Sequence, residues 1–133
     1  MPFNCQGKYG LGMREVDIAM SWPCTTNTTP FAPDRIAKRL IGTTVTYSAT
    51  GIYTIAIPGT FTAGLAWSVV ATAQADVVGH VFQVHPVGEV SQSGNVMTVT
   101  LQCVDYAGNA VAPAANTGTR INLLLVGSDS GGA

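Results

Sequence analysis

The strict alternation of apolar and polar residues after Gly42 is the feature that most constrains the fold of this chain. In "VMTVTLQCV", from Val96 to Val104, apolar side chains alternate with Thr and Gln. Successive side chains of a β-strand point to opposite faces, so this pattern predicts a strand with one buried and one exposed face. Cys103 falls on the buried face, which indicates a core side chain.

A second alternating stretch, "TYSATGIYTIAIPG" from Thr46 to Gly59, predicts a β-hairpin. Tyr47 before the turn and Tyr53 after it fall on one face. The turn between them contains Gly51, which can adopt a positive φ. Pro58 ends the second strand because proline has no N–H for the ladder. The other face is small and uncharged, and it suits packing against another copy of the chain.

Several more segments read as strands separated by turns. They are "REVDIAMSW", "LAWSVVATAQ", "HVFQVHPV" and "RINLLLV", with turns predicted at "SQSGN" (Ser91 to Asn95) and "DYAGNA". The last strand is apolar on both faces from Leu123 onward, as in a strand buried in a sandwich or a subunit interface. "DRIAKRLIG" fits a short helix and an edge strand equally well. About seven or eight short strands predict an all-β fold, an antiparallel β-sandwich with a jelly roll as its expected form.

The expected organisation is a single domain between two extended ends. Its segments are an N-terminal arm (1–12), the sandwich (13–127) with a first strand at about 13–22, a loop (23–34) and a main body (42–127), and a flexible C-terminal tail (128–133).

Charge is scarce in the main body. Only 10% of the 133 residues are charged, against about 25% in an average chain. Between Gly42 and Thr119 the only charged residues are Asp76, Glu89 and Asp105. Such a surface is either coated with neutral polar groups or covered by copies of the chain or a partner, and we expect the second.

The sequence offers little for chemistry, and we expect no enzyme. His80 and His85 would point to opposite faces of a strand, and the carboxylates are scattered. Phosphate-binding, nucleophile-elbow and zinc-protease motifs are absent. We therefore expect no cofactor, metal or small-molecule substrate. The net charge of −1 argues against nucleic-acid binding, and no apolar run is long enough for a membrane span.

Three cysteines in irregular positions argue against a disulfide framework and favour assembly in a reducing cytoplasm. "MPFNCQGKYGLG" lacks the apolar core of a signal peptide, so we expect it to stay on the mature protein.

Two groups of residues are candidates for contacts with other proteins. Five of the six basic residues precede Gly42, with aromatic residues among them, as in a basic front end that docks on an acidic protein surface. The alternative is a solvated edge or helix face. The candidate partner contacts are Phe3, Lys8, Tyr9, Arg14, Trp22, Arg35, Lys38 and Arg39. The candidate intersubunit packing residues are Tyr53, Trp67, Leu123 and Leu124.

Three stretches together resemble a diffuse group of small virion structural proteins of tailed bacteriophages. They are "GTTVTYSATGIYTIAIPGTF", "AWSVVATAQADVV" and "VMTVTLQCVDYAGNAVAPAANTGTRINLLLVGSDS", which together span about Gly42 to Ser130. The shared positions are Gly51, Tyr53, Ile55, Asp76, Arg120, Ile121, Asn122 and Leu123. The first 41 residues do not match the group.

The resemblance implies a sandwich or jelly-roll subunit, commonly a homotrimer, without a catalytic site. We expect a capsid cement (decoration) protein, assembled in the host cytoplasm, that binds the outer surface of the phage head and bridges major capsid proteins. The alternative is a trimeric receptor-binding head of a tail fibre or spike. A secreted trimeric binding domain of the tumour-necrosis-factor or complement-head kind is disfavoured by the lack of a signal peptide.

Overall fold

The computed structural model describes residues 14–36, 42–59, 67–79, 81–113 and 118–129, and within them the chain forms β-strands and no helix. The strands are β1 (Arg14–Pro23), β2 (Arg35–Ile36), β3 (Thr44–Ala49), β4 (Ile52–Pro58), β5 (Ser68–Gln74), β6 (Gln83–Pro86), β7 (Ser91–Ser93), β8 (Val96–Val104) and β9 (Arg120–Asp129).

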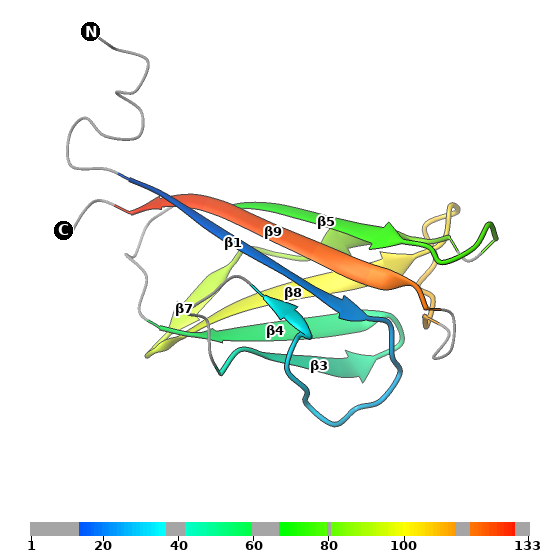
Figure 1. The fold of residues 1–133 in the computed structure, drawn as a ribbon, viewed down its shortest axis with the longest axis horizontal. Helices are drawn as coiled ribbons and strands as arrows, with labels where there is room; N and C mark the ends of the chain where they lie inside the picture. The colour runs from blue at the N-terminus through cyan, green and yellow to red at the C-terminus, as the bar shows by residue number, and fades with distance from the viewer. Residues whose placement is uncertain (1–13, 37–41, 60–66, 80, 114–117, 130–133) are drawn as a thin grey trace, which may run out of the picture.

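The strands form two sheets that pack face to face (Figure 1). One sheet has the order β2-β1-β9-β5 and the other β3-β4-β8-β6, with β7 also paired to β8. Every pairing is antiparallel. The predicted all-β antiparallel sandwich is therefore confirmed. The jelly roll stays a prediction, and the N-terminal arm (1–12) lies outside the described residues.

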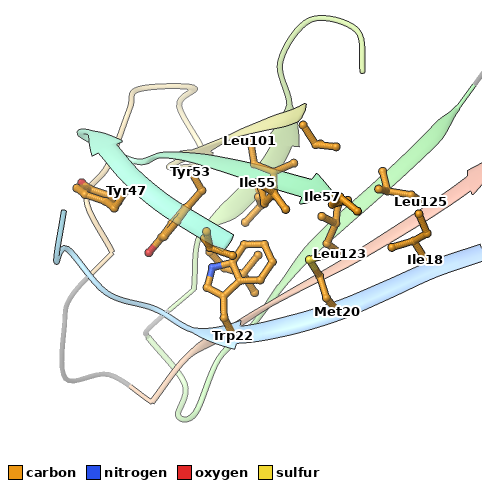
Figure 2. Packing of buried hydrophobic residues seen from close by; sticks show 14 of the residues in the cluster. Ile18, Met20, Trp22, Tyr47, Tyr53, Ile55, Ile57, Leu101, Leu123 and Leu125 are labelled. Atoms are coloured by element: carbon orange, nitrogen blue, oxygen red, sulfur yellow. The ribbon is translucent and has the colours of Figure 1, made fainter. Parts of the chain in front are cut away.

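The core lies between the sheets and follows the alternation of the sequence. Tyr53, Ile55 and Ile57 of β4 point inward and are fully buried, as are Leu101 and Cys103 of β8. Figure 2 shows side chains from β4 meeting those of β1 and β9 across the sandwich. Full burial of one large aliphatic or aromatic side chain stabilises a fold by about 1.5–3 kcal/mol, so this row is a main source of stability.

The turn between β3 and β4 is fastened to the rest of the fold. Gly51 has φ +73°, which confirms the predicted positive φ. Its carbonyl accepts a hydrogen bond from the N–H of Cys103 at 2.7 Å, and the N–H of Val111 donates to the carbonyl of Cys103 at 3.1 Å. A Cβ on Gly51 would lie 2.4 Å from the carbonyl oxygen of Val111 and 2.8 Å from that of Cys103. The turn therefore requires glycine for both conformation and space.

Several segments differ from the sequence expectation, and the predicted strand "HVFQVHPV" is among them, because only Gln83–Pro86 forms β6. The predicted turn from Ser91 to Asn95 is shorter, because Ser91–Ser93 pairs with the start of β8 and leaves only Gly94 and Asn95 as the turn. β9 continues to Asp129, two residues into the predicted tail. Of the segment left open between helix and edge strand, Arg35–Ile36 forms the edge strand β2, and residues 37–41 lie outside the described part of the chain.

Candidate subunit interface

The outer face of the sheet β2-β1-β9-β5 carries a row of exposed apolar side chains. The register places Leu124 of β9 opposite Ala19 of β1 on one side and opposite Val70 of β5 on the other. Leu124 is 38% exposed and Val70 is 53% exposed. These three residues, here called the apolar row, cross three neighbouring strands without a charge. An uncharged apolar row on an outer sheet face is a candidate contact surface.

A groove of about 490 Å³ runs over this row. Ala19, Val70 and Leu124 contribute to it, and the neutral polar side chains of Ser21, Thr72 and Asn122 border them. At the β2 end the groove is bounded by Arg35 and Ile36. It is therefore an apolar hollow with one basic side chain at its rim.

Beside the groove, Arg120 is already paired. Arg120 donates from Nε to Ser21 Oγ at 2.9 Å and from Nη1 to Asp34 Oδ2 at 3.1 Å, and its Nη2 contacts Asp34 Oδ1 as well. These hydrogen bonds from Arg120 hold the pKa of Asp34 below its usual value. The fork ties the loop before β2 to β1 and β9, so it fixes the wall of the groove.

The structure corrects three of the predicted contact residues. Trp22, Tyr53 and Leu123 were expected to face a partner or another subunit, but each is buried in the core of the chain itself. All three side chains lie on the inward face of their strands. Trp22 is on the same face of β1 as the buried Ile18 and Met20, and Leu123 is on the opposite face of β9 from the exposed Leu124. Their side chains leave no surface for a second chain to contact.

The other predicted contact residues have different positions. Leu124 lies on the outer face, in the apolar row. Trp67 is half-buried, packs against the core and covers Gly127. Arg35 is exposed at the rim of the groove. Arg14 begins β1, and nothing is described of its side chain. Phe3, Lys8, Tyr9, Lys38 and Arg39 lie outside the described residues.

Tyr53 has a structural role that the sequence did not indicate. Its hydroxyl donates to the carbonyl oxygen of Thr25 at 2.6 Å and accepts from the N–H of Thr25 at 3.0 Å. Its ring packs against Trp22 at 5.9 Å and against Tyr47 at 5.2 Å between centroids. Burial raises the pKa of Tyr53, so the hydroxyl stays protonated and able to donate. Tyr53 therefore fastens the loop after β1 to the core.

Neither described cysteine is suited to nucleophilic chemistry. Cys24 and Cys103 are buried and free. Burial raises the pKa of each thiol to about 12, and the negative charge of Asp76 adds to the effect on Cys24. A thiol is reactive as its thiolate, so both groups are inert near neutral pH. Among the described residues, no three His, Cys, Asp or Glu side chains come together as a metal site.

Sequence reasoning missed one group of exposed apolar residues, which lies in the turn between β5 and β6. Val77 and Val81 are about half exposed, and Val78 is fully exposed. Alternation of apolar and polar residues does not predict them, because a loop has no fixed periodicity. The three valines within five residues were the only signal.

Comparison of the chain with protein-family models, curated proteins and solved structures gave no match in any of the three. The resemblance to phage virion proteins therefore remains an expectation from sequence motifs. In the described part of the chain, no helix has the length and apolar character to cross a membrane.

Proposed function

We propose that this chain is a virion structural protein, a capsid cement subunit that self-associates and binds the outer surface of a phage head. The observation that carries the proposal is the apolar groove on the outer face of the sheet β2-β1-β9-β5, which has Arg35 as its one charged lining residue. The sequence resemblance supplies the virion context and the homotrimer as the proposed assembly.

The apolar row favours association because burying it costs little polar desolvation. Leu124 and Val70 expose apolar surface at the centre of the sheet, where each buried Å² contributes about 25 cal/mol. The adjacent Arg120 already has Asp34 and Ser21 as partners, so contact with a second chain does not leave it unpaired. A stable interface also needs about 800 Å² from each partner, so the contact would extend beyond the groove.

A cement protein would stabilise the shell because its contacts with the capsid are repeated. One trimer would make three equivalent contacts with the shell, and linked contacts bind more strongly than each contact alone. The proposed capsid contact is the basic front end of the chain outside the groove, with Lys8, Arg14, Lys38 and Arg39 as its cations. It would dock on acidic surfaces where major capsid proteins meet.

The self-association part of the proposal is tested with a charge in the apolar row. Leu124→Arg places an unpaired cation in the interface and should convert the trimer to a monomer in light scattering. Thr100→Arg is the matched control. Thr100 lies on β8 in the opposite sheet, and its side chain is on the strand face that points away from the core. It should leave the trimer intact. A wild-type protein that is monomeric at micromolar concentration would refute self-association.

The capsid part is tested by locating the protein in purified particles with electron cryomicroscopy. Density in a regular array on the shell is expected. Particles stripped of the protein should also lose resistance to heat and pressure. Density confined to the tail would refute the cement role.

A receptor-binding head is the second candidate, favoured by exposed apolar residues in the loops. Val78 and Tyr106 are among the most exposed large apolar side chains, and both lie in connections between strands. Binding residues often lie on loops that a rigid scaffold positions. Under this proposal, stripped particles would keep their heat resistance and lose only host adsorption.

A further inference from the structure

The turn between β5 and β6 projects apolar side chains into solvent. Val78 is fully exposed, with Val77 and Val81 half exposed beside it. Gly79 follows with φ +101°, a conformation that favours glycine and reverses the chain directly after Val78. This convex group, Val77 and Val78 together, is here called the valine tip. Contiguous exposed apolar side chains usually mark a contact with another molecule.

The valine tip and the groove are complementary in shape and charge. The groove is concave and apolar, with Arg35 at its rim. The tip is convex and apolar, and it follows Asp76 directly. Asp76 is held in position by Thr119, whose hydroxyl lies 3.4 Å from Asp76 Oδ1. The groove is broad and open to solvent, and its volume of about 490 Å³ gives room for two valine side chains.

The tip cannot reach the groove of its own chain. Val70 and Thr72 line the groove and belong to β5, the same strand that leads to the tip. An extended strand advances about 3.3 Å per residue, so β5 carries the tip away from its own groove. Figure 1 shows the β5–β6 turn beyond the end of β5, at one end of the sandwich. A groove filled by a valine tip must therefore receive it from a second copy.

We propose that the valine tip of one subunit inserts into the groove of the next, with Asp76 of the first near Arg35 of the second. The inference rests on the self-association proposed above and names its contact. Tip and groove are different surfaces, so the contact is heterologous, and such a contact closes into a ring when the rotation between neighbouring subunits is that of a closed ring. A ring of three would use every tip and every groove in the proposed homotrimer.

Directed crosslinking tests this contact. Val78→Cys and Leu124→Cys are introduced separately and together in a Cys5→Ser background, in which the remaining native thiols, Cys24 and Cys103, are buried. After mild oxidation, a mixture of the two single variants should give covalent dimers on a non-reducing gel. The double variant should give covalent trimers, because each subunit then carries both halves of the contact.

The matched control replaces the tip position with another exposed valine. Val87 is 46% exposed and lies after β6 rather than in the β5–β6 turn. Val87→Cys mixed with Leu124→Cys should give no crosslink. Crosslinking of Val78→Cys to itself, or equal crosslinking from Val87→Cys, would overturn the inference.

A second measurement separates this inference from the proposed self-association. Val78→Asp should weaken trimer formation at least tenfold in light scattering, whereas Val87→Asp should not. A trimeric Val78→Asp protein beside a monomeric Leu124→Arg protein would overturn the tip contact and leave self-association standing. If both variants remain trimeric, the chain associates through another surface, and both the tip contact and the groove as the interface are refuted.

Discussion

Replacing Gly51 with alanine tests how the β3–β4 turn is built. The left-handed conformation costs a residue with a Cβ about 1–2 kcal/mol. At Gly51 the new Cβ would also lie 2.4 Å from one backbone oxygen and 2.8 Å from another, distances at which the backbone must move. That movement disturbs the hydrogen bonds of Cys103 and Val111, each worth about 0.5–1.5 kcal/mol.

The sum is a predicted loss of about 2–5 kcal/mol in the free energy of unfolding. A typical domain has about 5–15 kcal/mol in total, so the variant would be severely destabilised. Gly88→Ala is the matched control: Gly88 has φ +69°, but a Cβ there would meet nothing within 4 Å. It should lose only the conformational part, about 1–2 kcal/mol. The entropy that alanine removes from the unfolded chain is common to both variants and cancels.

Urea unfolding followed by tryptophan fluorescence measures both values. Protein concentration must be the same in every experiment, because the proposed self-association would add to the apparent stability. If the two variants lose equal stability within about 0.5 kcal/mol, the close approach of Gly51 to Val111 and Cys103 does not exist as described.

Three further predictions follow from polar groups in the fold. Tyr53→Phe removes the hydroxyl that bonds both backbone groups of Thr25 and should cost about 1–3 kcal/mol in urea unfolding, whereas Tyr106→Phe, at an exposed position, should cost nothing measurable; equal effects would contradict the role of Tyr53. In a Cys5→Ser background, Ellman's reagent at about pH 8 should label no thiol of the native protein and two after unfolding, because burial keeps Cys24 and Cys103 protonated; rapid native labelling would refute their burial. Asp34→Asn should lower stability by no more than about 1 kcal/mol at neutral pH, since the pair with Arg120 is partly exposed. The pKa of Asp34 is lowered in the fold, so the contribution is present above the unfolded pKa of about 3.9 and is lost as pH falls through the folded value. Stability curves of wild type and variant should converge in acid, and a gap that widens there would reverse this sign.

For most strands the sequence by itself determined which residues form the strand and which face is buried, although Ser91–Ser93 was predicted as a turn. Val99 and Leu101 in β8 and Ile55 in β4 are inward as the alternation predicted, because side-chain direction along a strand is a local property of the backbone. The turn at Gly51 was predictable for the same reason, since a positive φ is a preference of single residues.

Apart from the β3–β4 hairpin, only the tertiary structure decided which strands are neighbours. Arg120 bonds Ser21 across 99 residues of sequence, and the apolar row joins Ala19, Leu124 and Val70 from three separate strands. No local pattern contains such pairings, because they depend on how two sheets close around a shared core. Trp22 is the clearest example of what the sequence did not predict. Its position near a loop suggested a contact with a partner, but β1 packs over β4 and places the Trp22 ring against Tyr53. The alternation predicted which side chains of a strand point inward and which point outward. The groove, however, exists only because β1, β9 and β5 lie side by side.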